Sequence, residues 1–149
     1  MAVSGEIGTT LFVSTTASTP ATETESGYDA LTFAQVVGVT SIPALGDEID
    51  VISAALLETG RTNYANGVKS GGTKQFPVQH LATDAGMAVI AANPGSTADF
   101  SFKVVDIDGT KRYFFGRIGG VMTVEKTPSS AKGSNFDVHI NSAITTVAA

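Results

Sequence analysis

The chain has 149 residues, no cysteine and a net charge of −5. This length suffices for one domain that buries roughly 68–70% of the surface of its unfolded chain, so the core needs no disulfides. Zero cysteine also excludes thiolate metal sites. The acidic balance argues against tight nucleic-acid binding, because such binding depends on Lys and Arg that neutralise phosphates. The negative net charge is equally compatible with a protein that never contacts DNA and with one along which DNA slides.

Membrane insertion by this chain is not expected. The first residues contain no Lys or Arg and no long apolar run, unlike a secretion signal. The longest apolar run, residues 87–92, is far shorter than the ~20 residues that a membrane helix needs.

The first part of the chain predicts strands and turns. Thr, Ser and Gly are abundant and only 15% of residues are charged, a composition typical of short strands. We expect a first strand at 9–15. Residues 16–29 are rich in Ser, Thr and Glu and have little apolar surface, so they predict an exposed loop.

Two further strands are expected at 31–40 and 48–54, separated by a turn with Pro43 and Gly46. Residues 56–73 then form either a loop or an extended, mobile hairpin. Loops this long in a compact domain are usually functional or disordered.

Asp47, Glu48 and Asp50 form an acidic cluster at the start of the second of these strands. Alternation predicts that Glu48 and Asp50 face solvent while Ile49 and Val51 point inward. A metal site is the alternative, but a solvated or pore-facing strand accounts for the pattern more simply.

Residues 75–81 alternate again, and the period then changes to that of a helix. Thr83 or Asp84 can cap a helix that places Met87 and Ile90 on one face and ends before Pro94. This is the only helix that the sequence predicts.

The stretch 98–122 is the strongest local signal. Phe100, Phe102 and Val104 share one strand face, Tyr113 and Phe115 share one face of the partner strand, and Asp108-Gly109 supplies the turn. A polar loop at 126–134 and a last strand at 135–140, continuing toward 147, complete the chain. The fold class expected is mainly β: a single β-sandwich or partly open barrel, spanning 1–149, with one flanking α-helix.

The sequence offers little support for a catalytic site or a metal-binding site. His80 lies in phase with Phe76 and Val78, which favours a core or interface histidine over a zinc ligand, and His139 lies on a polar face. The nucleophile motif G-x-S-x-G is absent. Asp106 to Gly109 begins like a calcium loop but lacks the later acidic ligand. We therefore expect no enzyme activity and no cofactor.

Three segments carry a family resemblance: GYDALTFAQVVGVTSIPALGDE at 27–48, FSFKVVDIDGTKRYFFGRI at 100–118 and INSAITTV at 140–147. Their order and spacing resemble the major tail tube protein of long-tailed, siphovirus-like bacteriophages. The resemblance implies a phage tail tube-like fold whose copies join edge to edge, normally six to a ring, while rings stack into a hollow tube through which DNA passes without tight binding.

The resemblance also implies partners and a location. The partners would be further copies of the chain and the tape-measure, tail terminator and distal tail proteins. The protein would belong to the tail of the virion and assemble in the host cytoplasm.

In such a tube the loop at 56–73, together with an N-terminal arm at 1–8 and a C-terminal arm at 141–149, would contact the neighbouring ring. Arg61, Tyr64 and Lys69 are the expected inter-ring contacts, because Arg and Tyr anchor interfaces well. Asp47, Glu48 and Asp50 are candidates for the lumen wall, where carboxylates would keep DNA from adhering.

Two alternatives to a phage tail remain open. One is an inner-tube or ring protein of a contractile or secretion device, which would share the fold. The other is a carbohydrate-binding β-sandwich, which is disfavoured because the chain has no Trp and only 7% aromatic residues.

Overall fold

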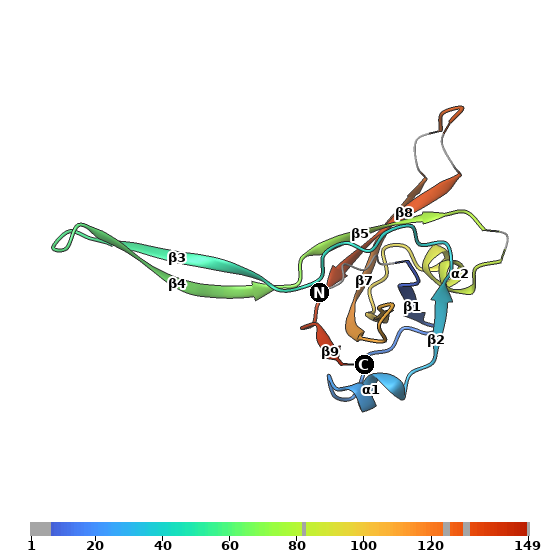
Figure 1. Cartoon of the computed structure of the whole chain (residues 1–149), viewed down its shortest axis with the longest axis horizontal. Helices are drawn as coiled ribbons and strands as arrows, with labels where there is room; N and C mark the ends of the chain where they lie inside the picture. Colours follow the sequence, from blue (N-terminus) through green and yellow to red (C-terminus); the bar gives the residue numbers. More distant parts are fainter. Residues whose placement is uncertain (1–6, 82, 124–125, 130–131, 149) are drawn as a thin grey trace.

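The computed structural model describes residues 7–81, 83–123, 126–129 and 132–148 (Figure 1). Its elements, in chain order, are β1 (Thr10–Ser14), α1 (Glu25–Asp29), β2 (Phe33–Val36), β3 (Glu48–Leu56), β4 (Arg61–Ser70), β5 (Thr73–Gln79), α2 (Ala85–Ala92), β6 (Phe100–Val105), β7 (Lys111–Thr123), β8 (Gly133–Ile140) and β9 (Thr145–Val147). Within these ranges, no helix is long and apolar enough to cross a membrane.

One seven-stranded sheet forms the body, with the order β2-β1-β6-β7-β8-β5 and with β9 paired to β7. All of its pairings are antiparallel. The sheet curls so that the chain after β2 meets β5: Val39 bridges Val78, and the Thr40 amide donates to the Pro77 carbonyl at 3.0 Å. The prediction of a mainly β, partly open barrel is confirmed.

The core lies inside this curled sheet. Phe102 faces Phe114 across β6 and β7 with ring centroids 5.3 Å apart, and Phe76 faces Phe136 across β5 and β8 at 5.2 Å. Such stacked rings add about 0.5–1.5 kcal/mol to the free energy of burial itself. Tyr113 lies on the other face of β7 from Phe114, opposite Lys103. The sequence thus predicted the hairpin correctly. The ring that packs against Phe102 is that of Phe114, whereas Tyr113 and Phe115 lie on the opposite face of β7.

Helix α1 packs against β7 through Tyr28, so residues 16–29 are not an exposed loop throughout. Tyr28 is fully buried and stacks on Tyr113 with ring centroids 5.0 Å apart. The Tyr113 hydroxyl donates to Asp29 Oδ1 at 2.9 Å, and burial together with this carboxylate raises the pKa of Tyr113 well above its usual range. One aromatic residue therefore anchors a segment whose average composition predicts no packing.

The C-terminal end of the chain differs from the expected arm. The C-terminal strand does not run on from β8: β9 pairs with residues 111–113 of β7, so part of the expected arm at 141–149 packs on its own sheet. The Phe115 amide donates to Ser142 Oγ at 2.9 Å where the chain turns. Of the expected N-terminal arm at 1–8, residues 1–6 lie outside the described residues.

Asp84 caps α2, as predicted, and also shapes the chain after β2. Its carboxylate accepts from the Met87 amide at 3.1 Å, and from the amides of Val37 and Gly38 at 3.1 and 3.0 Å. Because these two amides turn toward Asp84, β2 ends at Val36 and does not continue to residue 40 as the sequence predicts. The carboxylate thus connects α2 to the segment that leads to β3.

We expect Asp84→Ala to lower the free energy of unfolding by about 3 kcal/mol, because it removes a helix cap and two further hydrogen bonds to a charged acceptor. Urea denaturation followed by circular dichroism measures this loss. Thr83→Ala is the matched control, since Thr83 is exposed and is not the cap. Equal losses in the two variants would contradict the role of Asp84.

Candidate assembly surface

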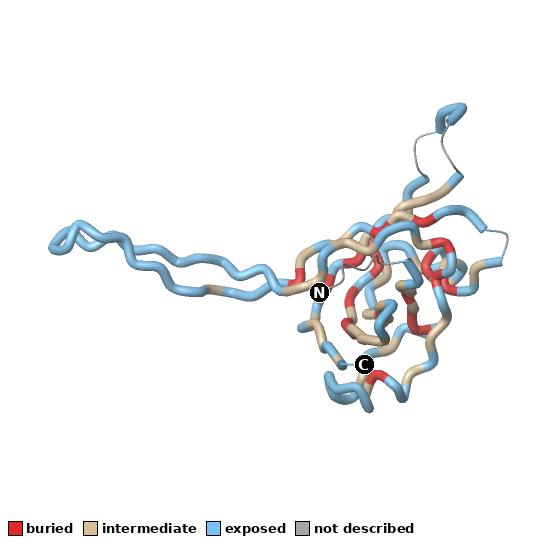
Figure 2. The backbone as a smooth tube through the Cα atoms, viewed as in Figure 1, coloured by how far each residue is buried: buried red, intermediate tan, exposed pale blue. Residues whose placement is uncertain are grey.

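Strands β3 and β4 form a two-stranded hairpin, here called the arm, that extends away from the body (Figure 1). All of its strand residues are exposed except Gly67, which is half-buried, and Figure 2 shows the same exposure along its length. At ~3.3 Å per residue, the nine residues of β3 span about 30 Å. Residues 56–73 are thus not a loop throughout: they supply the turn and β4, which forms an extended hairpin with β3, the strand expected at 48–54.

Large apolar side chains of the arm have nothing of their own chain to cover them. Leu57 is 102% exposed, and Tyr64 and Val68 are each 73% exposed. Ile49 and Val51, expected to point inward, are 44% and 64% exposed, so that prediction is wrong. The reason is that no described helix or strand packs behind either face of the arm. An isolated two-stranded hairpin is marginally stable in water, so this geometry needs a partner.

The arm contains one irregularity. Ile49 pairs with Lys69 and Val51 with Asn66, so Asp50 alone lies opposite two residues, Gly67 and Val68. Such a bulge increases the local twist and redirects the strands beyond it. The twist of the arm is therefore set close to its root.

The tip of the arm is a tight turn at residues 57–60. The Gly60 amide donates to the Leu56 carbonyl at 2.9 Å, and Gly60 has a φ of +66°, a conformation that favours glycine. Leu57 and Glu58 occupy the apex of this turn, and Arg61 begins the returning strand. An apolar side chain and two opposite charges are thus presented together.

The root of the arm is fixed to the body. A Cβ on Gly71 would lie 2.5 Å from Ile140 Cγ2, and Gly72 has a φ of +73°. The Ile140 amide donates to the Gly72 carbonyl at 3.0 Å. Lys74 Nζ lies 3.9 Å from Glu48 Oε1 on the first strand of the arm. The arm therefore leaves the body at a defined angle.

Arg61, Tyr64 and Lys69 all lie on β4, but at different distances from the body. Arg61 is opposite Leu56 at the tip, Tyr64 is opposite Ser53, and Lys69 is close to the root. Arg61 and Tyr64 face opposite sides of the strand because their positions differ by three, an odd number. The structure thus places all three on the arm but does not bring them together.

Asp47, Glu48 and Asp50 are all exposed at the root of the arm. Glu48 is paired with Lys74, as described above. Over the part of the chain that the structure describes, no three His, Cys, Asp or Glu residues are placed to hold a metal ion.

A groove lies in the body beside the chain segment between β2 and β3. Its volume is about 610 Å³, and its apolar wall includes Val39, Ile42 and Leu45. Asp106 and Arg112 also line it and form an ion pair with each other. Sequence reasoning missed this groove, because its lining comes from segments about 60 residues apart.

The two histidines do not form a common site. His80 is exposed beyond the end of β5, so the prediction of a core position is wrong, while an interface role stays a prediction. His139 is exposed on β8, and its Nδ1 lies 2.9 Å from Thr73 Oγ1.

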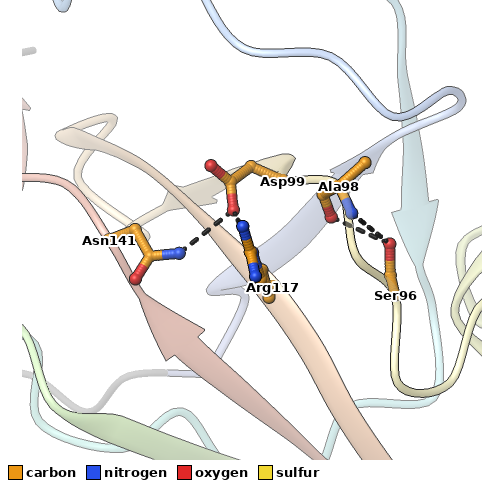
Figure 3. Close-up of polar contacts among 5 residues, drawn as sticks. All are labelled: Ser96, Ala98, Asp99, Arg117 and Asn141. Carbon is orange, nitrogen blue, oxygen red and sulfur yellow. Dashed lines mark hydrogen bonds and ion pairs between the residues drawn. The ribbon is translucent and has the colours of Figure 1, made fainter.

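Asp99, which directly precedes β6, connects β6 to two neighbouring strands (Figure 3). Its Oδ1 atom lies 3.4 Å from Arg117 Nε and 3.0 Å from Asn141 Nδ2. Nearby, Ser96 Oγ donates to the Ala98 carbonyl at 2.8 Å. This network joins the start of β6 to β7 and to the end of β8, so its role is to hold the sheet together.

No protein-family model and no curated protein matches this chain. Among solved structures, the chain is similar to the anti-feeding prophage cap, described as a tube terminating cap, which was determined by cryo-electron microscopy. The TM-score is 0.59 at 13% sequence identity, and the match covers 100% of this chain and 95% of the other. At this identity the likeness establishes the fold alone: the chain shares its fold with this tube terminating cap.

We expect deletion of residues 50–68, with Ile49 joined to Lys69 by an Asn-Gly turn, to leave the body folded. None of the described arm residues belongs to the hydrophobic core, so the melting temperature should change by less than about 4 °C. Self-assembly, followed by light scattering after size exclusion, should be lost. The deletion keeps Gly71, Gly72 and Lys74, which fix the root. Loss of cooperative unfolding would show instead that the arm supports the body.

Proposed function

We propose that this chain is a structural subunit of a virus tail or tail-like particle, which self-assembles into rings that stack into a hollow tube. The observation that carries the proposal is the arm: about 30 Å of exposed strand with large uncovered apolar side chains. The likeness of the whole chain to a tube terminating cap supports it. A surface of this kind in a soluble monomer marks a protein interface.

The sheet of the body offers a second surface for assembly. On the edge of β5 away from β8, the chain at 38–40 pairs with residues 77–79, and no described strand covers residues 73–76. Unpaired edges are a liability for a single molecule, and closure of a ring removes them. A barrel built from strands of several subunits is wide enough to leave an open channel. Six copies in the ring is the number that the sequence resemblance implies.

In this role the chain conducts DNA to the host cell without binding it tightly, and it works without catalysis or a cofactor. Its partners are further copies of itself and the tape-measure, tail terminator and distal tail proteins. It belongs to the virion tail and assembles in the host cytoplasm, and it does not insert into a membrane itself. The acidic net charge suits a wall along which DNA must slide.

The structural neighbour favours a second candidate, a ring that ends a tube. The anti-feeding prophage protein is described as a tube terminating cap. A subunit of this kind in a contractile or secretion device would form one ring and would need another protein as the tube below it.

Negative-stain electron microscopy of the purified chain separates these roles. A repeating tube subunit should give rings and open-ended tubes at high concentration, because each ring presents the same surfaces to the next. A terminating cap should give single rings only. A chain that stays monomeric at high concentration, also with tail-assembly partners added, would refute both roles.

We further expect Asp47, Glu48 and Asp50 to line the lumen near the arm root. Replacing all three with Lys should slow DNA delivery and leave tube assembly intact, because repeated cations would hold the phosphates that pass them. Particle infectivity and tube yield measure the two effects separately. Glu25→Lys on α1, at an exposed position away from the arm root, is the control. Equal delivery by both variants would place the acidic cluster outside the channel.

A further inference from the structure

The arm tip, residues 56–61, has an unusual combination of exposed groups. The Leu57 side chain is 102% exposed and Leu56 is 46% exposed. Glu58 and Arg61 flank them with opposite charges. Because the arm holds its tip about 30 Å from its own body (Figure 1), whatever covers these leucines comes from another molecule.

The groove in the body offers both apolar and charged groups to such a tip. Its volume of about 610 Å³ is within the range that holds a compact apolar group. The wall contains Ile42, Pro43 and Leu45, and both Ile42 and Leu45 pack against the core from a half-buried position. A pair of leucine side chains can therefore replace water here without displacing the core.

The charged groups of the groove are complementary to those of the arm tip. The side chains of Arg112 and Asp106 stay 34% and 19% exposed although they are paired. A guanidinium group has five N–H donors, so Arg112 can bind Asp106 and a second carboxylate together. Glu58 can supply that carboxylate, and Arg61 can approach Asp106.

We propose that the arm tip of one copy docks into the groove of a second copy, with Leu57 against Ile42 and Leu45 and with Glu58 paired to Arg112. The contact joins two different patches, so each copy keeps one free tip and one free groove. Such a contact propagates from copy to copy and does not stop at a dimer. This inference rests on the proposed assembly function and specifies the site through which neighbouring subunits join.

Site-directed cross-linking tests the contact directly, because the natural chain has no cysteine. We expect a Leu57→Cys, Ala44→Cys variant to give a ladder of disulfide-linked oligomers on a non-reducing gel after mild oxidation. Ala44 is exposed and lines the groove. The control pairs Leu57→Cys with Thr123→Cys, which is exposed but does not line the groove, and should give no ladder.

Charge reversal provides a test that needs no cysteine. Glu58→Arg or Arg112→Glu alone should raise the critical concentration for assembly about tenfold. An equimolar mixture should assemble again, because both kinds of contact between the two variants then join opposite charges. The natural tip of an Arg112→Glu copy meets the natural groove of a Glu58→Arg copy, and the tip carrying Glu58→Arg meets the groove carrying Arg112→Glu. Circular dichroism of each variant checks that it is folded.

The outcomes separate this inference from the function on which it rests. Rings or tubes of the cysteine variant without a groove-specific ladder would overturn the docking site and leave the assembly role standing. Absence of any assembly by the natural chain would overturn both. Reversal variants that are folded and assemble like the natural chain would also refute the contact.

Discussion

The carboxylate of Asp84 holds together the part of the structure that carries both proposed assembly surfaces. It accepts amide hydrogens from the first turn of α2 and from Val37 and Gly38, where β2 ends. Hydrogen bonds to a charged acceptor are among the stronger ones in proteins, because the full charge attracts each donor. The chain that leaves this point runs first along the groove and then into the arm. A single side chain thus links the core, through α2, to both surfaces proposed to meet in an assembly.

The molecule divides its apolar residues between two tasks. In the body, aromatic and aliphatic side chains from six strands and α2 fill the curled sheet and stabilise the monomer. On the arm, residues of the same types stay in water and contribute nothing to that core. Burying apolar surface is worth roughly 25 cal/mol per Å². The exposed apolar side chains of the arm would contribute this free energy only when a neighbouring molecule covers them. The residues that stabilise the fold are therefore separate from those that would drive the proposed assembly.

The sequence predicted the features that depend on local chemistry. The Asp108-Gly109 hairpin, the Asp84 cap and the mainly β class all follow from residues close together in the chain. It did not predict the burial of Tyr28, because that depends on Tyr113, 85 residues later. Likewise, alternation along β3 predicted an inward face for Ile49 and Val51, although no layer exists behind them. Alternation shows that a strand has two faces, but only the tertiary structure shows what each face contacts.

The fixed root of the arm has a mechanical consequence. With Gly71 against Ile140 and the Gly72 carbonyl bound to the sheet, the arm would act as a lever with its pivot near the bulge at Asp50, just beyond this anchored root. A rotation of about 10° at the pivot would move the end of a 30 Å lever by about 5 Å, the distance between neighbouring strands. A stack of such subunits could bend by small rotations at each pivot while every arm tip stayed docked in the groove of its neighbour. The stiffness of the whole filament would then be set by the few residues around one bulge.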